Sequence, residues 1–561
     1  MNKQIVALKK VMIKNQKINT FFLSLLFLVM LPNIMFIYFG EDSAVFTTTK
    51  RIVFFIYTLS LVLFPLSFLK PKIYFLLLIP FLPFALIDLY VLSITNAQST
   101  TMHYYSFFAT SINEADELAR GNISYIFLSI LYIGLFIFFL IKLKFTFGFR
   151  KKIKLYIGII SLAVITALLI RDFKIAYTFS KSNLLENTAY HFFVKLNKTF
   201  PFGVSSKTET VYKSFNQIKN FNDNNTGFLY KPTIINHDEK TIVLVIGETA
   251  RRNNFQLYGY ERKNNPKLVK ERNLIPFTKF TTCANFTLTS VAQILSSVGP
   301  INYKGVYNEL GLIAAFKESG YKTYWITNQN YSPGSIYNLY SKSADVFKNI
   351  STTLDMPNND SVTLPILDDF LKDENNRKFI IIHSIGSHYR YNLRYPKEFA
   401  RFKPELDGSI SVSDNGAEFK SKYVNSYDNS ILFTDYFLTE IIDKLKKNKE
   451  QSIMMYLSDH GENLYDDKRE LFLHGTSIPS KYELEIPMFV WHSNNYDKNT
   501  ISRLHQVKEK KLSSEIVFHT LSDLGGFKTK LHNYKYDLLS DSLIVGRRTV
   551  LKPDGSVMKV D

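Results

Sequence analysis

An aspartate and a histidine stand side by side where an apolar run of the sequence ends. The run covers residues 452–457 and predicts a buried strand, and Asp459 and His460 follow it. Gly461 then permits a tight turn, and another histidine, His474, lies shortly downstream. A carboxylate and an imidazole in this position can supply two ligands to one divalent metal ion. On its own, the pair fits a polar surface turn equally well.

Two further polar clusters follow apolar runs that also predict strands. Glu248 comes just after residues 241–246, in the position where open α/β sheets bind ligands, although the helix dipole alone also favours an acid near a helix start. The run at 379–382 precedes His383, which we expect in the core as a histidine whose hydrogen bonds are satisfied. His388 lies beyond the next glycine and is better placed to reach a site.

A cluster of hydroxyl side chains precedes the predicted helix at 288–297. A hydroxyl at a helix amino terminus faces unpaired N–H groups and the positive end of the dipole, which stabilise an alkoxide and bind phosphate oxygens. Thr287, Thr289 and Ser290 are all candidates, and ordinary helix capping explains any one of them. The residues alone therefore leave the choice among the three open.

Together these clusters offer glutamate, threonine, aspartate and histidine side chains to one metal ion. Oxygen and imidazole ligands without a thiolate suit zinc or manganese. A hydroxyl beside such an ion has a lowered pKa and becomes a nucleophile. The remaining histidines can hold a phosphoryl group or protonate a leaving group.

Strands and helices alternate along the chain from residue 239 onward. The predicted strands cover residues 241–246, 321–326, 379–382 and 452–457. The predicted helices cover residues 288–297, 309–319, 364–373 and 425–447. This alternation is typical of a parallel sheet that is covered by helices on both faces. We therefore expect an α/β domain with a mainly parallel central sheet at 239–561.

The first third of the chain is strongly apolar. Five segments approach the ~20 residues that cross a bilayer: 21–38, 52–69, 73–92, 123–141 and 155–170. The third contains Pro80, Pro83 and Asp88, so we expect a kink there. The sequence thus predicts an α-helical transmembrane domain with five spans at 1–171.

Lysine and arginine residues are concentrated in the amino-terminal tail and in the loops after the second and fourth spans, although Lys50 and Arg51 depart from this trend. The asymmetry predicts a cytoplasmic amino terminus and an external location for the chain after residue 171.

We expect residues 172–238 to form a bridging segment, with an amphipathic piece around Phe192 on the membrane surface and a loop at 220–227.

The chain has 561 residues, which is too long for one ordinary domain, and a formal net charge of +19. This charge suits a membrane surface or an acidic glycolipid, and we expect no nucleic-acid partner. Cys283 is the one cysteine, so an intramolecular disulfide is excluded.

The order of motifs resembles the membrane-bound phosphoethanolamine transferases of Gram-negative bacteria, which include the mobile colistin-resistance enzymes. This family belongs to the alkaline phosphatase/sulfatase superfamily. The matching motifs are GETAR at 247–251, TCANFT at 282–287, GSH at 386–388, YDNSIL at 427–432, SDHGE at 458–462 and HG at 474–475.

The resemblance implies specific roles for individual residues. Glu248, Thr287, Asp459 and His460 would hold a zinc ion (Zn²⁺, with Mn²⁺ as the alternative), and Thr287 would be the nucleophile that becomes modified. His388 and His474 match the histidines that bind the phosphoryl group or a second zinc, and Thr110 and Glu114 match positions that hold the donor lipid.

The resemblance also implies substrates and a location. Phosphatidylethanolamine would be the donor, and the core of lipopolysaccharide (LPS), lipid A or another envelope molecule the acceptor. The catalytic domain would lie in the periplasm, anchored in the bacterial inner membrane, and the activity would be linked to polymyxin resistance. Relatives that modify lipid A carry several disulfides, which the lone Cys283 excludes here, so a core sugar, another glycan or a protein stays open as acceptor.

Three other functions are alternatives to a phosphoethanolamine transferase. A sulfatase needs cysteine or serine in a C/S-x-P-x-R context, which residues 283–287 do not provide. A phosphoglycerol transferase of the lipoteichoic-acid-synthase type shares the five spans and a threonine nucleophile. A membrane scaffold with a decayed site is the non-enzymatic alternative, and the complete set of ligands argues against it.

Overall fold

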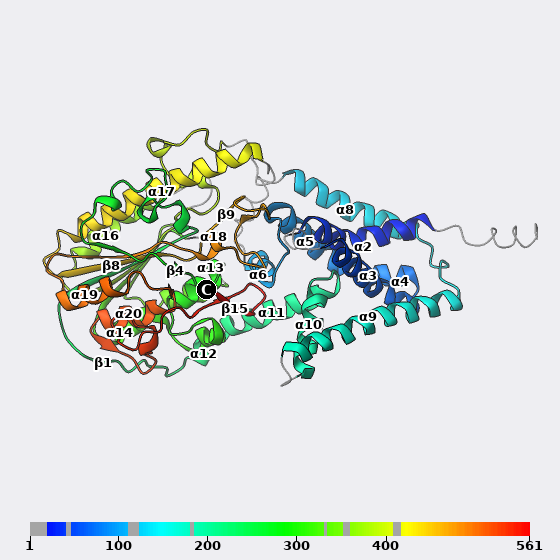
Figure 1. Ribbon diagram of the computed structural model, residues 1–561, viewed down its shortest axis with the longest axis horizontal. Coiled ribbons are helices and arrows are strands. Elements are labelled where there is room, and N and C mark those ends of the chain that lie inside the picture. Colours follow the sequence, from blue (N-terminus) through cyan, green and yellow to red (C-terminus); the bar gives the residue numbers. More distant parts are fainter. Residues whose placement is uncertain are drawn as a thin grey trace, which may run out of the picture. The chain divides into compact units, whose positions relative to one another are not determined.

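The computed structural model describes residues 19–40, 47–109, 123–179, 184–329, 334–351, 359–407 and 417–560 (Figure 1). The chain divides into two compact units. Unit 1 comprises Met1–Ser99 and Asn122–Glu209, and unit 2 comprises Thr100–Gly121 and Thr210–Asp561. The first part of helix α11 (Phe202–Lys219) therefore belongs to unit 1 and the rest to unit 2.

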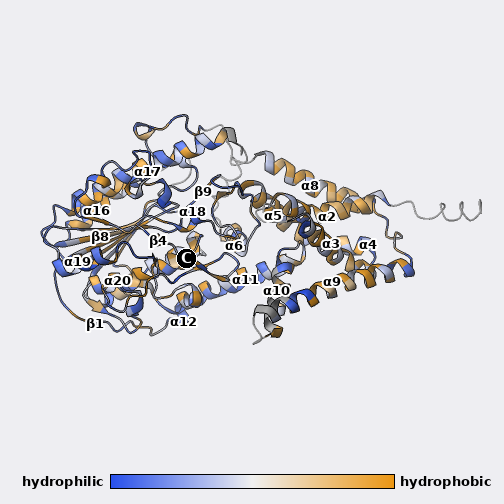
Figure 2. Ribbon diagram, in the orientation of Figure 1, coloured by the Kyte–Doolittle hydropathy of each residue, from blue (hydrophilic) through white to orange (hydrophobic). Residues whose placement is uncertain are grey.

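Unit 1 is built from apolar helices, which stand out in the hydropathy colouring of Figure 2. They are α2 (Thr20–Phe39), α3 (Thr48–Leu63), α4 (Pro71–Leu77), α5 (Leu82–Thr95), α8 (Ile123–Lys142) and α9 (Lys151–Phe179). Five stretches within the described residues are long and apolar enough to cross a membrane: Thr20–Phe39, Thr48–Ser67, Pro71–Thr95, Ser124–Lys142 and Lys151–Lys174. The five predicted spans are confirmed, and the chain is a membrane protein.

The third span is interrupted, as its prolines predict. Helix α4 ends at Leu77, a short 3₁₀ turn covers Ile79–Phe81, and α5 begins at Leu82. Pro80 lies in the turn and Pro83 in the first turn of α5. Proline lacks a backbone N–H and clashes with the preceding turn, so a continuous helix is broken here.

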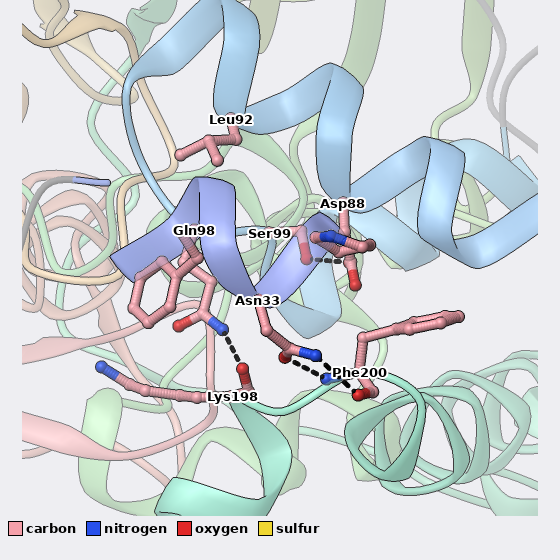
Figure 3. Close-up of a pocket in the computed structure, with 9 residues that line it drawn as sticks. Asn33, Asp88, Leu92, Gln98, Ser99, Lys198 and Phe200 are labelled. Atoms are coloured by element: carbon pink, nitrogen blue, oxygen red, sulfur yellow. Dashed lines mark hydrogen bonds between the residues drawn. The ribbon is translucent and has the colours of Figure 1, made fainter. Parts of the chain in front are cut away.

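Polar side chains inside unit 1 are paired with one another (Figure 3). Asp88 of α5 accepts a hydrogen bond from the Ser99 hydroxyl, and Lys207 Nζ lies 3.5 Å from Asp88 Oδ1 and donates to Ser99 Oγ at 2.9 Å. The Asn33 side chain of α2 bonds both the backbone N–H and the carbonyl of Phe200, each at 2.9 Å. Charges in an apolar bundle are costly unless paired, and these are paired.

The bridging segment is largely helical. It contains α10 (Leu184–Asn197), α11 (Phe202–Lys219) and α12 (Phe221–Asn224). The predicted loop at 220–227 is therefore wrong over the four residues of α12. The Phe221 side chain is buried in the core of unit 2 and contacts the ring of Tyr340, and this burial favours a helical turn over an open loop. The predicted membrane contact around Phe192, within α10, stays a prediction.

Unit 2 contains a seven-stranded sheet. In spatial order its strands are β3 (Leu274–Pro276), β11 (Met488–His492), β8 (Gln451–Ser458), β2 (Lys240–Gly247), β7 (Arg377–His383), β5 (Lys322–Thr327) and β6 (Val346–Asn349). The strands from β8 to β6 are parallel, and β11 runs antiparallel to both β8 and β3. The mainly parallel sheet and all four predicted strands are confirmed.

Helices cover both faces of this sheet, with α16 and α17 on one side and α14 and α20 on the other (Figure 1). Besides α12 and the second part of α11, the described helices of unit 2 are α6 (Thr101–Ala109), α13 (Thr287–Ile294), α14 (Gly311–Glu318), α15 (Ile336–Ser341), α16 (Leu364–Leu371), α17 (Ala417–Leu445), α18 (Lys481–Leu484), α19 (Lys498–Val507) and α20 (Ile516–Leu524). Every residue of β2 is buried, because a strand covered on both faces has no solvent side. The four predicted helices correspond to α13, α14, α16 and α17.

Short two-stranded pairs complete the unit. They are β1 (Thr233–Ile234) with β13 (Phe527–Lys528), β4 (Phe280–Thr281) with β12 (Leu512–Ser513), β9 (Asn463–Leu464) with β10 (Phe472–Leu473), and β14 (Arg548–Leu551) with β15 (Val557–Val560). The β9–β10 pair matters for the site, because it follows the Asp459–His460 step and leads directly into His474.

The register of the sheet brings the predicted clusters together. Gly247 at the end of β2 is opposite Ser458 at the end of β8, and Ile246 is opposite His383 at the end of β7. Glu248 and Asp459 therefore both lie just beyond the carboxyl ends of neighbouring parallel strands, which is where open α/β sheets bind ligands.

Candidate active site

Two carboxylates and an imidazole meet beyond β2 and β8. Glu248, Asp459 and His460 are fully buried, and one ligand atom from each lies within 4.8 Å of the others. His460 Nε2 is 3.4 Å from Glu248 Oε1 and 3.2 Å from Asp459 Oδ2. His460 Nδ1 is bonded to the Gly461 carbonyl at 2.9 Å, which turns Nε2 toward the two acids. The predicted grouping of these three residues is present in the structure.

The hydroxyl of Thr287 joins this cluster. Thr287 is the first residue of α13, and its Oγ1 donates to Glu248 Oε1 at 3.2 Å and lies 3.0 Å from His460 Nε2. The other two candidate hydroxyls have different contacts: Thr289 Oγ1 donates to the Phe286 carbonyl, and Ser290 Oγ donates to the Asp459 carbonyl. Among the three, Thr287 is the one that faces the acid and the imidazole.

The backbone between β2 and the site is strained. Thr249 has φ of 62°, a left-handed conformation that is unfavourable for a β-branched residue. In this conformation its N–H donates to Asp459 Oδ1 at 3.0 Å and its hydroxyl donates to Glu248 Oε1 at 2.8 Å. One strained residue thus fixes the position of both carboxylates.

Gln329 holds the second oxygen of Glu248. Its Nε2 donates to Glu248 Oε2 at 3.1 Å and to the Ser384 carbonyl at 2.8 Å. Sequence reasoning gave this residue no role. Its signal was available, because Gln329 lies two positions beyond the end of β5, at the same edge of the sheet as the other clusters.

Two histidines flank the cluster. The His474 ring lies 4.0 Å from the His460 ring, centroid to centroid, and its Nδ1 lies 3.1 Å from Oε1 of the buried Glu462. His388 Nδ1 is 2.6 Å from the Tyr389 carbonyl, and the backbone of His388 accepts a bond from Arg394 Nε at 2.9 Å. Glu462 belongs to the SDHGE motif, yet sequence reasoning did not assign it the role of orienting His474.

The loop that carries His388 is fixed by Asp360, whose carboxylate accepts hydrogen bonds from the N–H groups of Ile385 and Gly386 at 2.8 and 2.9 Å.

His383 is buried, as expected, and packs edge-on against Tyr337. Its Nε2 has no hydrogen-bond partner among the described residues, so the expectation of a satisfied core histidine is only half right. Thr110 and Glu114 lie outside the described residues, and their predicted contact with the donor lipid stays a prediction.

The electrostatics of the cluster suit a cation. Burial raises the pKa of the Glu248 carboxyl well above its ordinary range, and the neighbouring Asp459 raises it further. Burial lowers the pKa of His460, which keeps the imidazole neutral and able to act as a ligand. Oδ2 of Asp459 is buried without a hydrogen-bond partner in the described part of the chain. A divalent ion would satisfy this oxygen and offset the two acids, so the residues fit a metal.

Comparison with known families shows which family the second part of the chain belongs to. The sulfatase family matches residues 240–527, just over half of the chain. A curated relative, the Kdo(2)-lipid A phosphoethanolamine 7''-transferase of Escherichia coli (strain K12), is 32% identical over 287 residues, which cover 47% of this chain and 46% of that protein. The chain matches about half the length of such curated relatives.

Solved structures show the same fold. The integral membrane lipooligosaccharide phosphoethanolamine transferase A (EptA) from Neisseria meningitidis has a TM-score of 0.72 at 20% identity, and the match covers 93% of this chain and 98% of that one. The periplasmic domain of EcEptC from Escherichia coli, in complex with zinc, has a TM-score of 0.52 at 26% identity and covers 59% and 95%.

These matches confirm the resemblance that the motifs indicate. The family match begins at the first residue of β2 and ends at the first residue of β13, so it includes Glu248, Thr287, Asp459, His460 and both flanking histidines. By its matched residues, its sheet and its relatives, the chain belongs to the sulfatase family and, within it, is similar to the membrane-bound phosphoethanolamine transferases.

Proposed function

We propose that this protein transfers phosphoethanolamine from a phospholipid to a molecule of the bacterial cell envelope. The observation that carries the proposal is the position of Thr287 Oγ1, between Glu248 Oε1 and His460 Nε2 and at the amino terminus of α13. A hydroxyl in this environment is a nucleophile for phosphorus, because the helix end and a bound cation both stabilise its alkoxide.

Four residues would hold the metal: Glu248, Thr287, Asp459 and His460. Zinc fits their oxygen and nitrogen atoms, and manganese is the alternative. Zinc also accompanies the similar EcEptC domain. When bound, the ion supplies positive charge that lowers the pKa of the threonine hydroxyl and offsets the charge on phosphoryl oxygens. His388 and His474 would bind the phosphoryl group or a second ion, and the packing of the His474 ring 4.0 Å from the His460 ring supports this role for His474.

The first half-reaction forms a bond between Thr287 Oγ and the phosphorus of phosphatidylethanolamine. The bond between phosphorus and the glycerol oxygen breaks, and the proton given up by the Thr287 hydroxyl passes through His474 or His388 to that oxygen, so diacylglycerol leaves as a neutral alcohol. The positive end of the α13 dipole, at its amino terminus, would stabilise the charge that develops on the phosphoryl oxygens. Phosphoethanolamine then remains esterified to Thr287.

In the second half-reaction an acceptor oxygen attacks the same phosphorus, the bond between phosphorus and Thr287 Oγ breaks, and the proton that the acceptor gives up returns to the threonine oxygen. The acceptor would be a core sugar of lipopolysaccharide or lipid A, because the similar E. coli enzyme is named for transfer to Kdo(2)-lipid A. Cys283 is buried and free, so the disulfides of lipid A-modifying relatives are absent, and this favours a core sugar. The apolar helices of unit 1 would anchor the enzyme in the inner membrane, with unit 2 in the periplasm.

The test incubates the purified full-length protein with phosphatidylethanolamine alone and maps the modified peptide by mass spectrometry. We expect a phosphoethanolamine adduct on Thr287, no adduct in Thr287→Ala, and a weaker adduct in Thr287→Ser, which keeps the oxygen. A parallel incubation with phosphatidylglycerol tests the phosphoglycerol alternative. An adduct on Thr289 or Ser290 that persists in Thr287→Ala would show that another hydroxyl is the nucleophile.

A further inference from the structure

The YDNSIL motif at 427–432 lies within α17, and the resemblance to the transferases gives it no role. Tyr427 and Ser430 are three positions apart, so they lie on one face of the helix. Both side chains are buried, and they contact the two loops that follow β2 and β7. One of these loops begins at Glu248, and the other carries His388.

The Tyr427 hydroxyl bonds the backbone just after Thr249, the residue with the left-handed conformation. It donates to the Thr249 carbonyl at 2.7 Å and accepts a hydrogen bond from the N–H of Arg251 at 2.9 Å. The N–H of Ala250 donates to the Ser458 hydroxyl at 2.8 Å. The peptide group between Thr249 and Ala250 is therefore fixed at both its C=O and its N–H.

The peptide group before Thr249 is fixed in the same way. Its carbonyl, from Glu248, accepts a hydrogen bond from the N–H of Ser387 at 3.0 Å, and its N–H donates to Asp459 Oδ1 at 3.0 Å. Ser430 Oγ lies 2.9 Å from Ser387 Oγ, so α17 holds this loop as well. One turn of α17 thus supports both of the peptide groups that set the backbone angles of Thr249.

We propose that Tyr427 is a positioning residue for the metal cluster, because its hydroxyl keeps Thr249 in the left-handed conformation. In this conformation Thr249 bonds the carboxylates of Glu248 and Asp459 through its hydroxyl and its N–H. The conformation costs free energy for a β-branched residue, so it persists only while neighbouring groups hold it. This inference rests on the proposed function in one respect, namely that the cluster holds a metal ion.

Tyr427→Phe tests the proposal, since it removes the hydroxyl and keeps the ring that packs against Tyr391 and Arg251. We expect zinc to bind the metal-free full-length variant in detergent about tenfold to a hundredfold more weakly than the wild type, as for other losses of groups that orient metal ligands. Zinc affinity is measured by competition with a chelator of known affinity.

Tyr321→Phe is the matched control, because it also removes a buried tyrosine hydroxyl that donates to a backbone carbonyl, here that of Gly525 at 3.0 Å. The Tyr321 ring also packs against an arginine, Arg377. Tyr321 precedes β5, at the edge of the sheet opposite to the site. Both variants should lower the unfolding midpoint, but Tyr321→Phe should keep the zinc affinity within about twofold of the wild type, since the effects of distant sites are independent.

A second background separates positioning from general stability. Glycine adopts a positive φ without strain, so in a Thr249→Gly background Tyr427→Phe should weaken zinc binding by less than about threefold. The same pair of proteins decides the question if Tyr427→Phe alone does not fold.

Wild-type zinc affinity in Tyr427→Phe, an equal loss in Tyr321→Phe, or an undiminished loss in the Thr249→Gly background would overturn the proposal, and so would a wild type that binds no zinc. A wild type that binds zinc but forms no phosphoethanolamine adduct would instead overturn the proposed function alone.

Discussion

Thr287 Oγ1 lies 3.0 Å from His460 Nε2, although 173 positions separate the two residues in the sequence. The contact arises because α13 begins at Thr287, close to the end of β8, and because Ser290 in the same helix donates to the carbonyl of Asp459. The amino terminus of α13 is thereby bonded to the Asp459–His460 step. A change on either side should therefore alter the Glu248–Asp459–His460 cluster and the Thr287 hydroxyl together.

Asp459→Asn should remove the metal while leaving the fold intact. The asparagine Oδ1 can still accept the N–H groups of Thr249 and His460, which bond Asp459 Oδ1 at 3.0 and 2.7 Å. The lost charge and the poorer ligand at Oδ2 should reduce bound zinc at least tenfold. Metal content by mass spectrometry and the unfolding midpoint of the full chain in detergent are the two measurements.

Asp541→Asn is the control for this experiment, because the Asp541 side chain is fully exposed and lies outside the site. It should keep wild-type metal content and activity. A folded Asp459→Asn protein that retains a full complement of metal would contradict the ligand assignment.

Glu462→Ala should lower kcat about tenfold to a hundredfold without loss of the metal. Glu462 Oε1 is 3.1 Å from His474 Nδ1, and we expect this contact to hold the ring in the orientation that presents Nε2 to the substrate. Positioned acid–base groups contribute about 10²–10⁴-fold to rate, so partial misorientation accounts for this loss. Glu462→Gln can keep the bond and should restore most of the activity.

A double-mutant cycle checks that Glu462 acts through His474. If it does, Glu462→Ala should have little further effect in a His474→Ala background, because residues that work as a unit are not additive. Additive losses would mean that Glu462 has a separate role, such as packing under the β9–β10 pair.

Much of this architecture could be predicted from the sequence because the signals are local. The apolar composition of each of the five spans, and of the runs at 241–246 and 452–457, is enough by itself to predict that the segment is buried. Glu248 and Asp459 could be placed at one sheet edge because parallel strands end at the same side. The kink of the third span followed from Pro80 and Pro83.

The remaining features depend on contacts between distant segments, which a single sequence does not encode locally. Gln329 and Glu462 act through side-chain hydrogen bonds to Glu248 and His474. Apart from the family resemblance, the residues left Thr287, Thr289 and Ser290 open, and the contact with His460 distinguishes Thr287 from the other two. The segment at 221–224 looked like a loop from its asparagines and became α12 because the core buries Phe221.

The orientation of the membrane unit predicts the behaviour of reporter fusions. An enzyme reporter that is active only in the periplasm, fused after Asp561, should be active, because five spans from a cytoplasmic start end outside. The same reporter fused after Lys144, in the basic loop between the fourth and fifth spans, should be silent. A well-expressed but silent fusion at Asp561, or an active one at Lys144, would contradict the predicted topology.

Glu309 should make the stability of the protein depend on pH. Its buried carboxyl accepts bonds from the Ser297 N–H at 3.1 Å and from the Tyr230 hydroxyl at 3.0 Å, yet burial raises its pKa from 4.5 to about 7. Between these two values the folded state binds the proton more strongly than the unfolded state does. Stability contributed by the protonated group is therefore fully present below pH 4.5 and falls as the pH rises to about 7.

Glu309→Gln removes this titration, because the amide stays neutral and its oxygen still accepts a hydrogen bond. The wild type and Glu309→Gln should have similar unfolding midpoints near pH 5, and the wild type should become the less stable of the two above pH 7, by about 3 kcal/mol if one pKa unit is worth about 1.4 kcal/mol. Comparing the two proteins at each pH cancels the groups that they share. Glu374→Gln, at an exposed position, should follow the wild type across the range. A constant difference between wild type and Glu309→Gln from pH 5 to pH 8 would show that the Glu309 carboxyl does not change its charge on folding.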